Sequence, residues 1–153
     1  MGLPATVTAI EDVTSGLDLR TLTLSDGTVV PQLLDLVLTT DAGTLSAVSG
    51  SGVTATGAGS DTLTLRGTAT DLNDWFAVPS EVSYLGAQDA YGVAAATLTA
   101  TVDDGTGAVS IGSITVDINR LMIFDTSGKL AIRLTGTSAD ETLLGGETRL
   151  ALP

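Results

Sequence analysis

Hydrophobic and polar residues alternate with a period of two through most of the chain, which is typical of half-buried β-strands. Within the strand expected over 17–24 the alternation slips phase near Arg20, which predicts a bulge there. Pro31 stands at the first position of its expected strand, where the missing N–H does least harm. The pattern predicts strands at 5–10, 17–24, 31–40, 44–48, 61–67 and 81–86, with one short strand inside the Gly/Ser-rich segment 49–60.

The alternation breaks once, over residues 68–78, where the spacing is helical. Thr70 is the expected N-cap, and Leu72, Trp75 and Phe76 follow at i, i+3 and i+4. Pro79 ends the element. Because Trp75 shares the helical face of its apolar neighbours, we expect it to cap a core; an exposed contact anchor is the alternative.

Two apolar runs, 93–102 and 108–118, flank the turn DDGTG and predict a long hairpin. The C-terminal extension, residues 120–153, repeats this pattern with runs at 120–124 and 130–134 around DTSGK, and with a further turn at Gly145-Gly146. The sequence therefore predicts an all-β, immunoglobulin-like β-sandwich over 1–119 with one short helix, followed by a β-hairpin tail over 120–153.

The amino-acid composition favours β-strands and limits the kinds of site that the side chains can form. Hydrophobic residues make up 43% of the chain but aromatic residues only 3%, so the apolar mass is aliphatic and favours pleated sheet. The chain has no His and no Cys, which excludes disulfides, thiolate or imidazole metal sites and His-activated nucleophiles. Asp103 and Asp104 are adjacent and would face opposite sides of a strand, so they do not form an acid–base pair. We therefore expect no enzymatic activity.

Charge is distributed unevenly. The net charge is −12, and residues 1–119 hold 14 acidic residues against only Arg20 and Arg66. Such a surface repels nucleic acid and anionic membranes, and no segment reaches the length of a membrane span. The first residues carry no basic and apolar signal-peptide pattern. We expect the protein to stay inside the cell until assembly or lysis, or to leave by a route without an N-terminal signal.

Four segments resemble the cadherin-like, immunoglobulin-type repeat domains of large bacterial surface proteins. They are AIEDVTSGLDLRTLTLSDG (9–27), TTDAGTLSAVSG (39–50), DTLTLRGTATDLNDWFAV (61–78) and EVSYLGAQDAYGVAAATLTATVDDG (81–105). The resemblance covers about residues 7–118 and implies a β-sandwich. The chain departs from the family in two ways: the turn SDGT supplies only Asp26 where the family often has two acids, and the domain occurs once rather than in tandem.

The expected sandwich would also bring acidic residues together in a candidate metal site. In an immunoglobulin-like sandwich the loops after the second and sixth strands lie at one end, which would gather five carboxylates. Such a cluster repels itself unless a cation bridges it, and Ca²⁺ takes six to eight oxygen ligands. The alternative is that Asp-Gly pairs only form turns. The candidate Ca²⁺ ligands are Glu11, Asp12, Asp26, Asp103 and Asp104.

The C-terminal extension has its own candidate role. The run LMIF is apolar on both faces, so it must pack on its own domain or on a partner. Its basic residues could bridge two acidic domains that would otherwise repel each other. An extra hairpin that extends its own sandwich is the alternative. The expected assembly contacts are Arg120, Leu121, Met122, Ile123, Phe124, Lys129, Arg133 and Arg149.

Two functional classes follow from these features. In the first, the protein is a non-catalytic structural module that docks on a larger assembly, such as a decoration, cement or tail protein of a phage or phage-like virion. In the second, it is a module of a secreted bacterial adhesin or surface filament, stiffened by Ca²⁺. Its partners would be protein subunits or further copies of itself, at the surface of a virion or of a cell.

Overall fold

The computed structural model describes residues 2–25, 27, 30–121, 123–124 and 130–131. The chain divides into two compact units, which we call the body (Met1–Leu121) and the tail (Met122–Pro153). The described part of the tail is a short antiparallel hairpin of β10 (Ile123–Phe124) and β11 (Leu130–Ala131). This pairing falls within the hairpin predicted at 120–134, whereas the turn predicted at Gly145-Gly146 lies outside the described residues.

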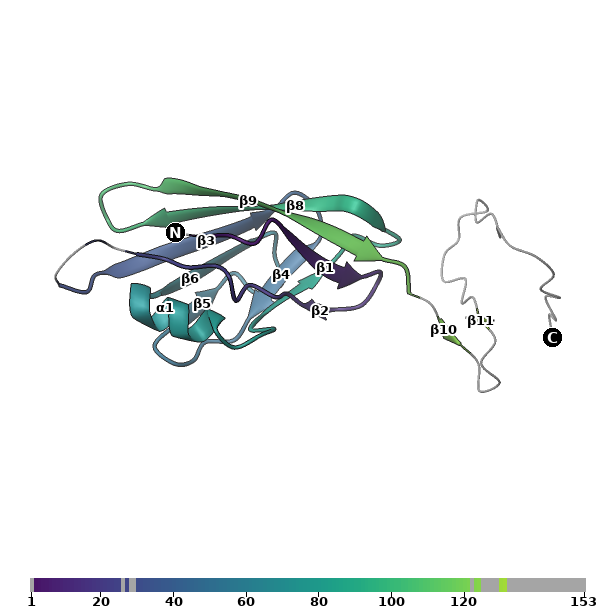
Figure 1. Ribbon diagram of the computed structural model, residues 1–153, viewed down its shortest axis with the longest axis horizontal. Coiled ribbons are helices and arrows are strands. Elements are labelled where there is room, and N and C mark those ends of the chain that lie inside the picture. Colours follow the sequence, from purple (N-terminus) through teal and green to yellow (C-terminus); the bar gives the residue numbers. More distant parts are fainter. Residues whose placement is uncertain (1, 26, 28–29, 122, 125–129, 132–153) are drawn as a thin grey trace. The chain divides into compact units, whose positions relative to one another are not determined.

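A six-stranded sheet forms most of the body and curls into a half-barrel (Figure 1). Neighbouring strands in this sheet are antiparallel except for the pair β1 (Thr6–Ile10) and β9 (Val109–Asn119), which run parallel. Each predicted strand in this sheet is present, and so is the long hairpin around DDGTG. The strand order is β1 (Thr6–Ile10), β9 (Val109–Asn119), β8 (Gly92–Asp103), β3 (Leu33–Thr40), β6 (Thr62–Thr68) and β5 (Thr54–Thr56).

A second sheet has three strands, in the order β2 (Ser15–Gly16), β7 (Val82–Leu85) and β4 (Thr44–Ala47). The predicted strands at 44–48 and 81–86 are therefore confirmed. The protein is mainly β with one short helix, as its sequence predicts, and its strands divide into a six-stranded curled sheet and a three-stranded sheet.

The prediction of a regular strand over 17–24 is wrong. Leu17, Leu19, Leu22 and Leu24 are all buried, so the alternation correctly predicted which side chains point inward. The backbone, however, turns near Arg20, where the N–H of Leu22 donates to the carbonyl of Leu19 at 2.8 Å. The phase slip is therefore a turn and not the expected bulge. The carboxylate of Asp18 stabilises this turn, because it accepts the backbone N–H of Arg20.

The predicted helix is present as α1 (Ala69–Phe76), but its N-cap is Thr68, not Thr70. The hydroxyl of Thr68 accepts the backbone N–H of Asp71 at 3.1 Å, and the carboxylate of Asp71 accepts the N–H of Thr68 at 3.3 Å. This reciprocal capping box satisfies two donors that helix geometry leaves free. The strand β6 thus leads directly into the helix with no intervening loop.

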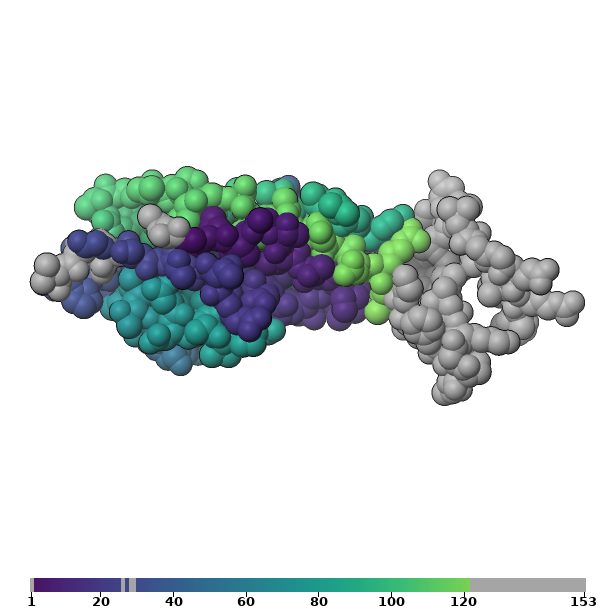
Figure 2. Space-filling view, viewed as in Figure 1, coloured from purple at the N-terminus to yellow at the C-terminus, as the bar shows by residue number. Residues whose placement is uncertain are grey.

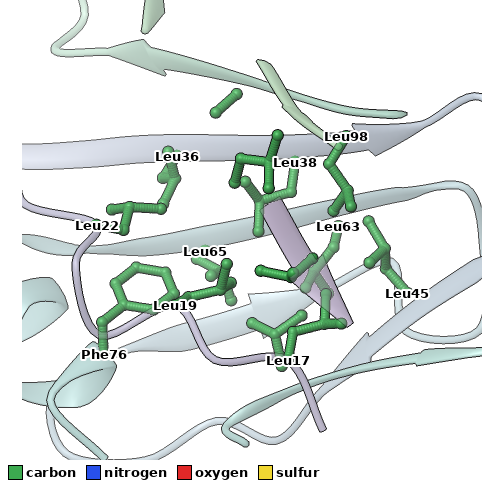
Figure 3. Packing of buried hydrophobic residues seen from close by; sticks show 14 of the residues in the cluster. Leu17, Leu19, Leu22, Leu36, Leu38, Leu45, Leu63, Leu65, Phe76 and Leu98 are labelled. Atoms are coloured by element: carbon green, nitrogen blue, oxygen red, sulfur yellow. The ribbon is translucent and has the colours of Figure 1, made fainter. Parts of the chain in front are cut away.

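Leucines from both sheets, from α1 and from the 17–24 segment fill one core (Figure 3). Leu36, Leu38, Leu63 and Leu65 project from β3 and β6 toward the leucines of the 17–24 segment (Figure 3). Trp75 is only 3% exposed, which confirms that it caps the core. Because the segment 17–24 contributes side chains without a full backbone ladder, its position depends on packing and on a few specific hydrogen bonds.

Candidate functional site

Three chain segments meet at one end of the body, which we call the exit end because the chain leaves the body there. Ile10, the last residue of β1, pairs with Asn119, the last residue of β9. Gly92, the first residue of β8, pairs with Ile118. The residues after β1, the loop before β8 and the residues after β9 therefore come together, although they lie far apart in the sequence.

Three carboxylates gather at the exit end. Oxygen atoms of Glu11, Asp12 and Asp89 all lie within 4.8 Å of one another. Among the residues that the structure describes, these three are the acidic side chains that lie close enough together to share one cation. The first two residues follow β1, and Asp89 belongs to the loop between β7 and β8.

Backbone hydrogen bonds hold this cluster together. The N–H of Asp89 donates to Oδ1 of Asp12 at 3.1 Å, and the N–H of Leu121 donates to Oε2 of Glu11 at 3.3 Å. The N–H of Glu11 in turn donates to the carbonyl of Asn119 at 2.8 Å. Asp12 and Asp89 both adopt left-handed backbone conformations, with φ of 54° and 59°, which Asp tolerates better than most residues.

The chemistry of the cluster favours a hard cation. Three carboxylates this close repel one another, and a bridging cation would relieve the repulsion. Ca²⁺ takes carboxylate and carbonyl oxygens in flexible geometry, and the loops at the exit end offer both. Asp12 and Asp89 are exposed and Glu11 is half-buried, so an ion could reach all three from solvent.

The structure does not bring the five predicted Ca²⁺ ligands together. Glu11 and Asp12 lie at the exit end. Asp103, the last residue of β8, and Asp104, in the turn after it, lie at the opposite end of β9. The strand β9 has 11 residues, so about 33 Å separates the two pairs. The expectation of one common cluster is therefore wrong for these four residues, and Asp26 lies outside the described residues.

Asp103 and Asp104 shape the turn between β8 and β9. Oδ1 of Asp103 accepts the N–H groups of Gly105 at 2.7 Å and Gly107 at 3.1 Å. Oδ1 of Asp104 accepts hydrogen bonds from the hydroxyl and the N–H of Thr106. Both bonds lower the pKa of the Asp104 carboxyl, and the bond from the hydroxyl has the larger effect. These bonds are those that Asp makes in tight turns, so both side chains serve the turn.

Two of the predicted assembly residues lie at the exit end. The guanidinium carbon of Arg120 stands 3.7 Å from the centre of the Tyr91 ring, a cation–π contact between the end of β9 and the loop before β8. Leu121 is 45% exposed. Ile123 and Phe124 form β10 in the tail. The other four, Met122, Lys129, Arg133 and Arg149, lie outside the described residues.

Sequence reasoning missed Asp89. The residue sits in the polar loop AQDAYG, which carries no periodic signal. Its neighbourhood follows from the parallel pairing of β1 with β9 and the antiparallel pairing of β9 with β8. A sequence-based expectation of those two pairings would have placed the loop before β8 beside the residues after β1.

Comparison of the chain with protein-family models, with curated proteins and with solved structures found no match. No helix among the described residues is both long and apolar enough to cross a membrane.

Proposed function

We propose that this protein is a non-catalytic structural module that docks on a larger assembly through its exit end and its tail. The observation that carries the proposal is the exposure of large apolar side chains at the exit end. Tyr91 is 50% exposed, Val93 86%, Leu121 45% and Ile10 42%. They come from the three segments that meet there, and exposed apolar groups of this kind mark protein contacts.

The arrangement suits a contact that is apolar at its centre and charged around it. Arg120 lies over Tyr91, which keeps a cation beside the aromatic ring. The carboxylates of Glu11, Asp12 and Asp89 stand at the same end. A partner subunit with apolar residues and complementary charges would bury the exposed apolar side chains and pair with the three carboxylates. The apolar run LMIF begins at Leu121, so it continues the same apolar character into the tail.

The type of assembly we propose is a phage or phage-like virion, with this chain as a decoration, cement or tail protein on its surface. The absence of His and Cys from the sequence and the acidic net charge support a structural role over catalysis or nucleic-acid binding. We also propose the finer fold assignment, a cadherin-like or immunoglobulin-like sandwich. The β content supports it, although the division into six and three strands differs from the four and three of an immunoglobulin constant domain.

Truncation of the chain tests the docking role. A variant that lacks residues 120–153 should keep the Trp75 fluorescence of the folded body but lose association with the particle, or with further copies, in sedimentation velocity. Val93→Asp should weaken association because it places a charge at the exit end. Val48→Asp is the matched control, since Val48 is 79% exposed but belongs to the β4–β5 connection. Normal association of the truncated protein would refute the proposal.

The acidic cluster favours a second candidate function, a Ca²⁺-stiffened module of a secreted adhesin or surface filament. If Ca²⁺ binds Glu11, Asp12 and Asp89, it ties the segment after β1 to the loop before β8. Ligand at 100 times its Kd would stabilise the fold by about 2.7 kcal/mol. That stabilisation would raise the Tm by roughly 6–12 °C for a domain of this size.

Calorimetry in EDTA and in millimolar Ca²⁺ separates the two candidates. The adhesin function predicts a rise in Tm with Ca²⁺ that Asp89→Asn abolishes and Asp103→Asn leaves in place, because Asp103 lies at the far end of β9. An equal Tm in both buffers would remove this second candidate and leave the docking role untouched.

A further inference from the structure

A bulge at the start of β8 holds one apolar side chain out in solvent. The one-to-one register of β8 with β9 is lost between Gly92 and Ala96, where three residues of β8 stand opposite one residue of β9, Asp117. A bulge of this kind bends its strand and redirects a side chain. Within it lies Val93, which is 86% exposed, the highest value among the large apolar side chains that the structure describes.

The backbone of the bulge is in an unfavourable conformation. Ala94 has φ of 50°, in the left-handed region where the Cβ of an L-residue comes too close to the following carbonyl oxygen. Oδ1 of Asp117 accepts the N–H of Ala94 at 2.8 Å, which fixes the conformation. Strained backbone persists only where the surrounding structure enforces it, and such residues cluster at functional sites. The exposure of Val93 is therefore a feature that the fold enforces.

Val93 belongs to a group of exposed apolar side chains that we call the exit patch. Figure 2 shows the start of β8, in teal-green, at the surface of the body beside the end of β9, in light green. The pairing of β1 and β8 with β9 brings the segments of the patch together, and exposed apolar groups of this kind favour burial against another molecule. The exit patch consists of Ile10, Tyr91, Val93 and Leu121.

Arg120 carries a positive charge beside the exit patch that no described carboxylate neutralises. The other two described arginines, Arg20 and Arg66, each form an ion pair with an Asp. The guanidinium of Arg120 instead stacks on the ring of Tyr91. A stacked guanidinium keeps its N–H groups at the edge of its plane, where they can bind a carboxylate through two hydrogen bonds.

The acidic cluster (Glu11, Asp12 and Asp89) lies at the same end of the body, and among the described residues no cation pairs with it. Glu11 accepts the N–H of Leu121, the residue next to Arg120, yet the arginine side chain lies over the aromatic ring. One end of the body thus presents an unpaired cation and unpaired carboxylates next to an apolar patch. Such a surface is complementary to a second copy of itself.

We infer that the exit ends of two copies of this chain pack on each other around a two-fold axis, with Val93 of both copies at the centre and Arg120 of each copy bound to the acidic cluster of the other. The inference rests on the proposed docking role and names a second copy as the partner. A two-fold interface uses the same surface from both copies, so the residues of one end are sufficient to form it. Tyr and Arg, which are stacked here, are among the residue types that most often carry the affinity of protein contacts.

Cysteine cross-linking of the full chain tests the position of the axis, because the chain has no cysteine of its own. Val93→Cys should give a disulfide-linked homodimer under mild oxidation, since a residue at a two-fold axis lies next to its own copy. Val48→Cys is the matched control and should stay monomeric, because Val48 is 79% exposed but belongs to the β4–β5 connection. Equal dimer yields from the two variants, or no dimer from Val93→Cys, would overturn the inference.

Reversal of one charge tests the pairing of Arg120. Arg120→Glu should raise the Kd of self-association of the full chain by about tenfold or more, because it sets a carboxylate against the acidic cluster of the other copy. Sedimentation equilibrium measures this Kd, and an unchanged value would overturn the inference.

A mixing experiment tests whether the charges pair between copies. A triple variant with Glu11→Gln, Asp12→Asn and Asp89→Asn neutralises the acidic cluster but keeps its hydrogen-bond acceptors. Mixed with Arg120→Glu, it should form a heterodimer in excess over both homodimers, because only the heterodimer joins an Arg120 to an intact acidic cluster. Native mass spectrometry with one isotope-labelled variant counts the three species, and a random distribution would overturn the inference.

Two outcomes separate this contact from the docking role. A full chain that stays monomeric, but whose Val93→Asp variant still loses association with the particle, would leave the docking role in place and overturn only the two-fold contact. A monomeric full chain that also fails to associate with the particle would overturn both.

Discussion

Asn73 offers the sharpest test of how the segment 17–24 is held in place. Nδ2 of Asn73 donates to the carbonyl of Leu24 at 2.9 Å, and Oδ1 accepts the N–H of the same residue at 2.8 Å. One amide side chain in α1 thus makes the two backbone bonds that a neighbouring strand would otherwise make. We predict that Asn73→Ala destabilises the body strongly for a substitution at a half-buried position.

The magnitude follows from the two bonds. Each contributes about 0.5–1.5 kcal/mol to stability, and an orphaned buried backbone group costs more. Leu24 is 5% exposed, so water reaches its freed N–H and C=O only in part. We therefore expect a loss of about 2–3 kcal/mol, equivalent to a fall in Tm of roughly 6–12 °C.

Trp75 provides the assay. It is the only Trp of the chain and lies two residues from Asn73, buried in the core. Urea unfolding followed by Trp fluorescence therefore reports on the body alone and yields its free energy of unfolding. Asp74→Ala is the matched control, because Asp74 is the exposed neighbour on the same helix, and its loss should stay within about 0.5 kcal/mol.

Equal losses for the Asn73→Ala and Asp74→Ala variants would refute the reasoning, since the two hydrogen bonds would then contribute nothing measurable. Asn73→Asp adds a second check. Its carboxylate keeps an acceptor for the N–H of Leu24 but turns an oxygen toward the carbonyl, so this variant should be no more stable than Asn73→Ala at pH 7.

Three other predictions concern the cap, one ion pair and one glycine. Thr68→Ala should cost about 1 kcal/mol of stability in urea unfolding, whereas Thr70→Ala should cost well under half of that; the reverse order would contradict the capping box. The side-chain hydrogen bond from Arg20 lowers the pKa of Asp18 from 3.8 to about 2, so the ionised carboxylate stabilises the fold above pH 4, and this stabilisation is lost as the pH falls through 2. Arg20→Gln should return the pKa of Asp18 toward 3.8 in an NMR titration, and an unchanged pKa would refute the pairing. Gly43→Ala should cost on the order of 2–3 kcal/mol, because φ is 81° and a Cβ would meet the carbonyl of Leu85; Gly59→Ala, with φ of 80° but open space, should lose less in the same unfolding assay.

Local patterns in the sequence determined most of the elements. Period-two alternation placed the strands of the six-stranded sheet and, in the smaller sheet, β4 and β7 but not β2. The spacing of Leu72, Trp75 and Phe76 placed the helix and its buried face. These signals depend on neighbours a few residues away, which the sequence displays directly. The correct cap was also present as Thr-x-x-Asp over 68–71, although the expected cap was Thr70.

The candidate site depended on pairings between distant segments. The sequence contained Glu11, Asp12, Asp103 and Asp104, but the parallel pairing of β1 with β9 placed the first pair about 33 Å from the second. The antiparallel pairing of β9 with β8 then placed Asp89 beside the first pair. No local pattern encodes which strands become neighbours, because that choice depends on packing across the whole core.

The segment 17–24 combines both kinds of information. Its sequence determined the burial of four leucines, since alternation follows from the geometry of an extended chain. Only the tertiary structure decided that its backbone would lack a ladder, because the turn near Arg20 and the side chain of Asn73 take up the hydrogen bonds that a neighbouring strand would have made.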